Sequence, residues 1–416
     1  MMKTNTKIET KNPVNRRQFL GSTLSMAAAA SVVLPSTRVA AAEPATEITR
    51  KIKLGVIGNG GRGGWIAGLF KRHGGYEMHA VADYFQQVAD ACGDAQGVDK
   101  ARRFSGLSGY KKLIESGVEA VVLETPPYFM PEQAQAAVDA GLHVYMAKPV
   151  ASDVPGALQI LACGKVAGQK KRVFLVDYQM PTDPVNIEVR KRILEGGLEA
   201  IAQVSTSGVC GGFRDPPKTG TLESRLQSLI WTNDIALGCD YLGNFDIHAI
   251  DAALWVLGQR PVAAMGSSRI CRPEPHGDSH DVCSVVYEYA NGMVHNHYGQ
   301  GLGNNAEGEL ICRIHGTKAH AVVNYYGKAF LRGGPKHFGG GPVENLYEAG
   351  AVRNIAAFYR NIIANQFEND TVPRAVDGVL TCVLGREAAN RHGRLTMDAL
   401  LKENKKLEVD LKGLKV

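Results

Sequence analysis

Residues 53–70, with the sequence KLGVIGNGGRGGWIAGLF, constrain the fold more than any other part of the chain. An apolar strand runs into a glycine turn, and the turn runs into the start of a helix. Gly58, Gly60 and Gly63 fall on the frame G-x-G-x-x-G. Glycine at these positions allows the tight turn, the approach of a pyrophosphate, and close packing of helix on strand. The pattern predicts a dinucleotide-binding turn, with an ordinary glycine-rich strand–helix turn as the alternative.

An acidic residue follows this turn at the distance that a dinucleotide site requires, roughly 20 residues on. The second expected strand, at residues 77–82, ends at Asp83. A carboxylate there accepts hydrogen bonds from the adenosine ribose hydroxyls and repels a 2′-phosphate, so Asp83 favours NAD over NADP. The alternative is an acid that only caps the helix expected to start at Gln86.

Strands and helices alternate through residues 51–180, which predicts a doubly wound parallel sheet. Residues 118–123 are a continuous apolar run, typical of a parallel strand buried on both faces. The prolines of Thr125-Pro126-Pro127 end this strand, because proline cannot donate to the ladder. Parallel strands place ligands beyond their carboxyl ends. The glycine turn, Asp83, residues 125–127, Lys148 and residues 177–179 are therefore expected along one edge.

The pattern changes after residue 180, and we expect a second, α+β domain at residues 181–416. Longer strands are expected at 200–207, 262–270, 281–289, 293–299 and 309–315. Asn291-Gly292, between two of them, is a strong hairpin signal. These strands predict a large, mostly antiparallel open sheet. Residues 211–219 and 333–342 are rich in glycine and proline and are expected to be loops.

Residues 1–42 are predicted to be a cleaved signal peptide, followed by a linker at residues 43–50. A basic segment with Arg16-Arg17 precedes a short apolar run, and Ala40-Ala41-Ala42 supplies the small residues of a cleavage site. The paired arginines followed by Phe19-Leu20 indicate a twin-arginine export signal, hence a periplasmic protein. The alternative is a general secretory signal. The apolar run is shorter than the ~20 residues of a membrane span, so no stable span is expected after removal of the signal.

Composition excludes several other classes of protein. The 416 residues carry a formal net charge of +6, part of it in the N-terminal segment. Basic residues interleaved with aromatics do not form a run in the body of the chain, so no nucleic-acid partner is expected. The eight cysteines are scattered without a C-x-x-C pair, which favours buried or free thiols over a disulfide framework or a metal site.

Taken together, these motifs resemble the Gfo/Idh/MocA family of oxidoreductases. The turn at residues 58–63 matches the first turn of that family, and Ala147-Lys148-Pro149 stands where the family usually has Glu-Lys-Pro. Residues 243–251, GNFDIHAID, resemble its acid-and-histidine helix, and residues 395–398 resemble its usual ending. The resemblance covers nearly all of residues 51–403 and is not specific for a substrate.

The resemblance implies catalytic roles for Lys148 and His248. Lys148 would hydrogen-bond a sugar hydroxyl beside the nicotinamide, and His248 would be the general acid or base. The alternatives are a solvated strand-end lysine and a structural histidine bonded to Asp251. The chain departs from the family pattern at Asn244, where an aspartate usually orients the histidine, and at Ala147. Asp246 would take over the orienting role if the backbone there is irregular.

The resulting set of expected site residues has three parts. The catalytic candidates are Lys148, His248, Asp246 and Asn244. The residues expected to contact the cofactor are Gly58, Asn59, Gly60, Gly61, Arg62, Gly63, Asp83, Thr125, Pro126, Pro127, Tyr128 and Lys148. The residues expected to contact substrate are Tyr178, Asp246 and His248.

The expected function is an exported NAD(H)-dependent oxidoreductase that acts on a sugar, glycoside or polyol with a tightly held cofactor. Free cofactor should be scarce outside the cytoplasm, so the enzyme should keep its cofactor through turnover. Two alternatives remain: an NAD-dependent glycosidase that oxidises C3 transiently and eliminates the glycoside, and a non-catalytic cofactor-binding or sugar-sensing protein. The resemblance also implies a homodimer or homotetramer assembled through the open sheet.

Overall fold

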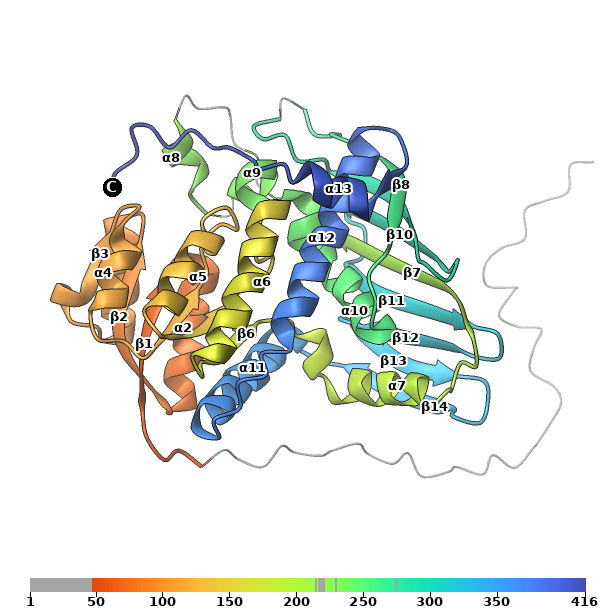
Figure 1. The fold of residues 1–416 in the computed structure, drawn as a ribbon, viewed down its shortest axis with the longest axis horizontal. Coiled ribbons are helices and arrows are strands. Elements are labelled where there is room, and N and C mark those ends of the chain that lie inside the picture. The colour runs from red at the N-terminus through yellow and green to blue at the C-terminus, as the bar shows by residue number, and fades with distance from the viewer. Residues whose placement is uncertain (1–46, 214, 216–220, 229, 274) are drawn as a thin grey trace, which may run out of the picture. The chain divides into compact units, whose positions relative to one another are not determined.

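The computed structural model describes residues 47–213, 215, 221–228, 230–273 and 275–416 (Figure 1). The predicted signal peptide, the first part of the predicted linker, and residues 214 and 216–219 of the predicted loop at 211–219 lie outside these described residues. Within the described ranges, none of the helices combines the length and the apolar character needed to cross a membrane.

Six parallel strands form the first sheet, as the alternation of strands and helices predicted. Their order is β3-β2-β1-β4-β5-β6, and the order reverses between β1 and β4. Such a reversal is the switch point beside which doubly wound sheets bind ligands. The strands are β1 (Ile52–Ile57), β2 (Tyr76–Asp83), β3 (Arg103–Ser105), β4 (Ala120–Leu123), β5 (His143–Met146) and β6 (Phe174–Val176).

Both faces of this sheet are buried, which explains its continuous apolar strands. In β4, Ala120 and Val122 pack into one apolar core, and Val121 and Leu123 pack into the other. The covering elements along the chain are α2 (Gly61–His73), α3 (Gln86–Gln96), η1 (Lys100–Arg102), α4 (Gly109–Glu115), α5 (Met130–Asp139) and α6 (Val154–Gln169).

The helix α11 (Leu346–Ile363) belongs by sequence to the second half of the chain but packs on the first sheet. Phe358 and Tyr359 are fully buried there against Phe70 of α2 and Tyr76 of β2. The two halves of the chain therefore share apolar packing. A new sheet begins after residue 180, but the apolar core continues from one half of the chain into the other.

Nine strands form the second sheet, in the order β14-β13-β12-β11-β7-β10-β9-β8-β15. All neighbours are antiparallel except β7 and β10, so the sheet is mostly antiparallel, as predicted. The strands are β7 (Ile201–Cys210), β8 (Ala263–Arg269), β9 (Val282–Glu288), β10 (Val294–Gly301), β11 (Glu309–Gly316), β12 (His320–Asn324), β13 (Gly327–Arg332), β14 (Phe338–Val343) and β15 (Leu395–Thr396).

The predicted loop at residues 333–342 is wrong in its second half, where β14 pairs with β13. Gly339, Gly340 and Gly341 give this strand little side chain, and Pro342 cannot donate to a ladder. An edge strand tolerates both features, because only one side of it is paired. The expected hairpin at Asn291-Gly292 is confirmed between β9 and β10.

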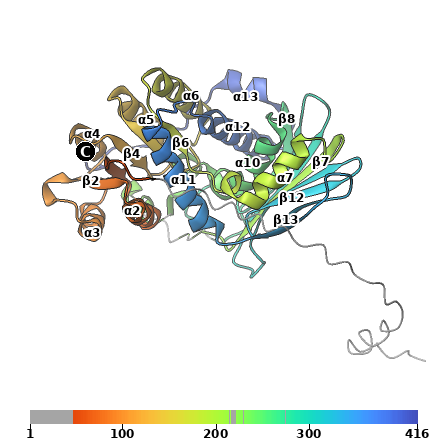
Figure 2. The same cartoon turned by 90° about the horizontal axis from the view of Figure 1, so that it is seen from below.

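Helices α7 (Pro184–Leu194), α10 (Ile247–Leu257) and α12 (Thr371–Asn390) cover one face of the second sheet (Figures 1 and 2). Met265, Val294 and Tyr298 on the other face are 39–46% exposed. The remaining short elements are η2 (Met180–Thr182), α8 (Leu222–Arg225), η3 (Ile230–Asn233), α9 (Ile235–Gly238), the π-helical turn η4 (Leu242–Asp246) and α13 (Met397–Glu403).

Candidate functional site

A cavity of about 670 Å³ opens at the carboxyl ends of the parallel strands. One wall is the glycine turn and the strand ends of the first sheet, and the other is η4, the start of α10 and the residues around Tyr325. The volume lies within the range of roughly 300–1,000 Å³ typical of small-molecule and cofactor sites.

The glycine turn has the geometry that its motif predicts. Gly58 has a φ of +88°, and a Cβ there would lie 2.7 Å from the backbone of Glu124. A Cβ at Gly63 would lie 1.8 Å from the carbonyl oxygen of Gly58, so helix α2 packs directly on the turn. In contrast, a Cβ at Gly60 or Gly61 would meet nothing within 4 Å. The turn thus leaves open space at the N-terminus of α2, where a phosphate binds favourably.

Asp83 lines the cavity at the end of β2, as predicted. Its carboxylate accepts hydrogen bonds from the backbone N–H of Asn59, at 2.7 Å, and of Phe85, at 3.0 Å. Burial raises the pKa of Asp83, and these backbone hydrogen bonds oppose the rise. The carboxylate therefore fixes the glycine turn as well as facing the space where a ribose would lie. It caps no turn of α3, whose N-cap is Phe85.

Lys148 lines the cavity at the end of β5, with its ammonium group held by the opposite wall. Its Nζ donates a 2.6 Å hydrogen bond to the carbonyl oxygen of Asn244 in η4. Burial lowers the pKa of Lys148 to about 7, and the Arg62 guanidinium lowers it further, while Asp177 and Glu124 act in the opposite direction. A lysine with this pKa can both accept and donate a proton near neutral pH.

Glu124 and Asp177 form a buried charged cluster with Arg62. The sequence placed Asp177 on the ligand edge and Arg62 among the cofactor contacts, but Glu124 and the cluster were not predicted. Arg62 Nε lies 3.0 Å from Glu124 Oε2, and the same guanidinium pairs with Asp177. Burial raises the pKa of Glu124 to about 7 despite the Arg62 charge. Gln179 and Asn354 also donate to Asp177, at 3.0 and 2.7 Å.

The strand register explains why these charges meet. Leu123 of β4 pairs with Met146 of β5, so Glu124 lies beside Ala147. Asp177 follows β6 on the other side of Lys148, because its N–H bonds the carbonyl oxygen of Met146. Glu124 thus supplies a carboxylate next to the position where Ala147 replaces the expected acid. Glu124 and Asp177 each directly follow an apolar strand, and an acidic residue in that position is a sequence feature that identifies both as site candidates.

His248 lines the cavity from the first turn of α10, beneath Tyr325, whose ring centroid is 5.2 Å away. The pKa of His248 is lowered by burial, then by the Lys148 and Arg62 charges, so the ring is neutral at pH 7. Its Nδ1 is buried and has no hydrogen-bond partner among the residues that the structure describes. The alternative role bonded to Asp251 is not found, because Asp251 pairs with Arg374 at 2.7 Å.

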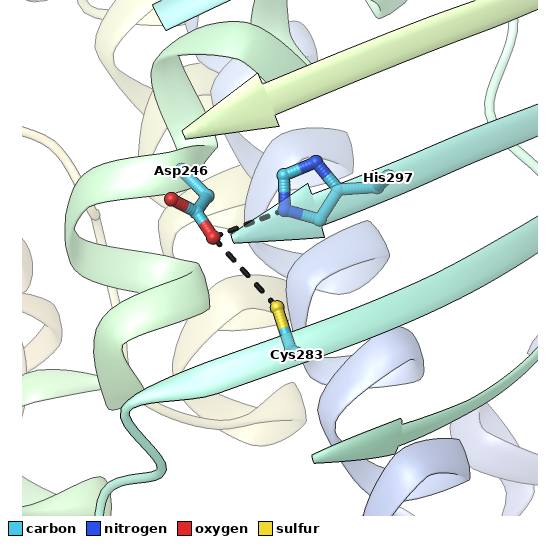
Figure 3. A group of neighbouring side chains, drawn as sticks. All are labelled: Asp246, Cys283 and His297. Carbon is cyan, nitrogen blue, oxygen red and sulfur yellow. Dashed lines mark hydrogen bonds and ion pairs between the residues drawn. The ribbon is translucent and has the colours of Figure 1, made fainter. Parts of the chain in front are cut away.

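Asp246 does not orient His248, although the backbone before it is irregular, as that role required. The π-helical turn η4 ends at Asp246, but the carboxylate points to the second sheet, where it lies 3.0 Å from His297 Nε2 (Figure 3). Asp246 and His248 are two positions apart in the chain, so the side chains leave opposite sides of the helical segment. The side chain of Asn244 does line the cavity.

Three other predicted contacts lie outside the cavity lining. Asn59 is 5% exposed, and its side chain bonds the carbonyl oxygen of Val56. Tyr178 is buried behind His248, with ring centroids 6.2 Å apart. Tyr128 is not among the lining residues, whereas its neighbour Phe129 is. The other expected cofactor contacts that line the cavity are Gly58, Gly60, Gly61, Arg62, Gly63, Thr125, Pro126 and Pro127.

Segments from distant parts of the chain close the adenosine end of the cavity, near Asp83. The hydroxyl of Tyr84 donates to Glu223 in α8, at 3.0 Å, and accepts from the backbone N–H of Lys415, at 3.1 Å. Leu226 and Trp231 also line the cavity. A dinucleotide in this cavity would be covered by these contacts.

Two family models match the chain in succession. Residues 52–178 match the model described as "Oxidoreductase family, NAD-binding Rossmann fold", and residues 188–322 match "GFO/IDH/MocA C-terminal domain". Inositol 2-dehydrogenase of Rhizobium meliloti (strain 1021) is 25% identical over 243 residues, which cover 58% of this chain and 66% of that protein. Levoglucosan dehydrogenase of Pseudarthrobacter phenanthrenivorans is 24% identical over 251 residues, covering 55% and 62%. The chain thus spans slightly less than two thirds of these relatives.

Solved structures share the fold across most of the chain. Levoglucosan dehydrogenase in complex with NADH and levoglucosan matches with a TM-score of 0.69 and 17% identity, covering 84% of this chain and all of that one. Aldose-aldose oxidoreductase from Caulobacter crescentus matches with a TM-score of 0.65 and 19% identity, covering 83% and 100%.

Proposed function

Because the chain belongs to the Gfo/Idh/MocA family of oxidoreductases, we propose that it transfers a hydride between a hydroxyl group of a sugar, glycoside or polyol and NAD. The observation that carries the proposal is the buried amine of Lys148, with a pKa of about 7, in the same cavity as the glycine turn. The relatives named for inositol and levoglucosan support a cyclic polyhydroxylated substrate.

The residues at one end of the cavity fit NAD. The open space over Gly60 and Gly61 suits a pyrophosphate at the N-terminus of α2, and Asp83 suits an unphosphorylated ribose. NAD bound there supplies the acceptor of the hydride. The strand ends that carry Lys148 and Thr125 would then flank the nicotinamide end.

Lys148 is the residue that we assign to the hydroxyl proton. Its amine form accepts the proton as the C–H bond breaks, and its ammonium form returns the proton in the reverse direction. The carbonyl oxygen of Asn244 aims the Nζ across the cavity. His248, with its unpartnered Nδ1, is placed to bind and orient a second hydroxyl group of the substrate.

We also propose that the protein is exported and keeps its cofactor through turnover. The paired arginines at residues 16–17 support export. The contacts of Tyr84 with Glu223 and Lys415 support retention, because they join α8 and the C-terminal segment to a residue of the cavity lining. The exposed Met265, Val294 and Tyr298 support self-association through the open face of the second sheet.

The test is a panel of sugars, glycosides and polyols, including inositol and levoglucosan, added to protein purified without cofactor. The absorbance of reduced nicotinamide and the NAD released on denaturation are measured. We expect close to one NAD per chain, and a rise in absorbance with at least one compound. Protein that is empty and needs millimolar NAD would contradict retention. Net cleavage of a chromogenic glycoside would assign the glycosidase reaction instead, and no response to any compound would contradict catalysis.

A further inference from the structure

A second polar cluster lies on the side of η4 that faces away from the cavity. Asp246 at the end of η4, Cys283 on β9 and His297 on β10 each direct one ligand atom to a common point, and these atoms all lie within 4.8 Å of one another (Figure 3). The side chains of Asp246 and His297 are both 0% exposed. Carboxylate, thiolate and imidazole groups are the ligands that zinc prefers in proteins.

The carboxylate of Asp246 lacks a compensating charge. Among the ion pairs of the described residues, its only partner is His297, and no lysine or arginine contacts it. One oxygen, Oδ1, is buried without a hydrogen-bond partner. A buried carboxylate in this situation is costly unless a proton or a cation joins it. A bound cation would therefore supply the positive charge that the Asp246 carboxylate lacks.

The distances between the ligand atoms suit a tetrahedral metal ion. Asp246 Oδ2 lies 3.0 Å from His297 Nε2 and 3.8 Å from Cys283 Sγ. Zinc bound tetrahedrally at ordinary bond lengths places such oxygen and nitrogen atoms about 3.3 Å apart, and oxygen and sulfur about 3.5 Å apart. Shifts of a few tenths of an ångström would bring these two pairs of atoms to the zinc-bound separations, and all three ligand atoms already lie within 4.8 Å of one another.

The surroundings hold the ligands in place. The Nδ1 of His297 contacts the hydroxyl of Thr206, at 2.9 Å, which directs the other ring nitrogen to Asp246. Metal-binding histidines are usually fixed by such a second contact. Gly208 and Gly299 are direct partners on β7 and β10, and a Cβ at either position would lie within 2 Å of the Asp246 carboxylate. This glycine pair forms the hollow that receives the carboxylate.

We propose that Asp246 Oδ2, Cys283 Sγ and His297 Nε2 supply three ligands of one zinc ion. Binding takes up the thiolate form of Cys283 and releases the thiol proton. The ion would tie η4 to β9 and β10, and so fix the turn whose other side carries Asn244 and His248. The three ligands lie far apart in sequence, which is why the cysteine spacing indicated only free thiols.

The experiment is a cobalt titration of the full chain after treatment with a chelator. Cobalt bound to a thiolate has an intense charge-transfer absorbance that cobalt bound to nitrogen and oxygen alone lacks. We expect this band to saturate at one Co²⁺ per chain. Cys283→Ser should abolish the band and weaken binding at least about tenfold, and Asp246→Asn should weaken binding similarly. Cys271→Ser is the matched control, because Cys271 is exposed and lies outside the cluster.

The outcomes are distinguishable. Zinc should raise the unfolding temperature of the wild type and of Cys271→Ser, but not of Cys283→Ser. Absence of the thiolate band in folded wild-type protein would overturn the proposal, as would equal binding by Cys283→Ser, which indicates an adventitious ion only. If Cys283→Ser does not fold, the wild-type band and the weaker cobalt binding of the nearly isosteric Asp246→Asn decide.

Discussion

The two sides of the segment from Leu242 to Leu257 carry polar clusters of opposite character. On the cavity side, Arg62 pairs with Glu124 and Asp177, and Lys148 lies in the field of all three. On the sheet side, Asp246 has a histidine and a thiol for neighbours, and no lysine or arginine of the described residues forms an ion pair with it. Balanced charges that border a cavity can exchange protons with a substrate. The Asp246 carboxylate is closed off from solvent, so only a proton or cation inside the protein can stabilise it. We assign it a role in holding the segment in place.

The largest expected effect comes from removing the amine on the cavity side. Lys148→Ala should lower kcat/KM for the sugar found in the panel by about 10³-fold, because general acid–base catalysis contributes on that order. Steady-state kinetics with saturating NAD measure it. Lys170→Ala is the matched control, since Lys170 Nζ also bonds a backbone carbonyl, that of Val138, but outside the cavity.

Cobalt binding by Lys148→Ala tests whether the cavity-side cluster and the sheet-side cluster are independent of each other. The variant should keep the metal stoichiometry of the wild type, because Lys148 is not part of the sheet-side cluster. A loss of turnover smaller than about tenfold would contradict the assigned role of Lys148.

A smaller effect is expected at the adenosine end, where Asp83 is the half-buried carboxylate that we expect to contact the ribose. Asp83→Asn removes the negative charge and should reduce the preference for NAD over NADP by about 10–100-fold, the worth of a charged hydrogen bond. Dissociation constants of both cofactors measure this. Asp94→Asn, on the exposed side of α3, should leave the preference unchanged. An unchanged preference in Asp83→Asn would remove Asp83 from the cofactor site.

Retention of the cofactor should depend on the contacts that close the same end. Tyr84→Phe removes the hydrogen bonds to Glu223 and Lys415, and should speed the release of NAD about fivefold, given ~1 kcal/mol for a net hydrogen bond. Release is followed by trapping with an excess of a competing dinucleotide. Tyr298→Phe, whose hydroxyl bonds Glu309 on the second sheet, is the control. Equal release rates in all three proteins would show that these contacts do not govern retention.

The smallest effect is expected from Glu124→Gln, which perturbs the charge balance without removing a reacting group. Glu124 raises the pKa of Lys148, so its loss should move the midpoint of the pH profile of kcat/KM to lower pH. Glu119→Gln serves as the control at the opposite end of β4, where Glu119 pairs with Arg50. A midpoint that moves upward, or moves equally in both variants, would contradict the charge cluster as described.

Much of the first sheet and its ligand edge was predictable from the sequence, because parallel strands bury both faces and end at polar residues. Gly58, Asp83 and Lys148 were found this way. Glu124 and Asp177 carried the same signal, yet their pairing with Arg62 depends on strand order and register, which local sequence does not specify.

The sheet-side cluster was not predictable. The orientation of Asp246 depends on the π-helical turn and on the hollow that Gly208 and Gly299 form across two strands. The helical spacing predicted that Asp246 and His248 lie on opposite sides. It could not predict the partners of Asp246, because Cys283 and His297 come from separate strands. Tyr128 and Phe129 show the same limit on a finer scale, because one residue of rotation decided which ring lines the cavity.

The central claim is that the proton of the reacting hydroxyl passes to and from Lys148, and the pH dependence of both directions tests it most directly. Below its pKa of about 7 Lys148 is charged and cannot accept a proton. With the sugar found in the panel, kcat/KM for oxidation should therefore rise about tenfold per pH unit below 7 and level off above it. Reduction of the ketone should do the reverse, falling above the same midpoint, and Lys148→Arg, which cannot lose its proton near neutral pH, should lose the oxidation reaction. Profiles of the same shape in both directions, or a Lys148→Arg variant that keeps the wild-type oxidation profile, would contradict the account.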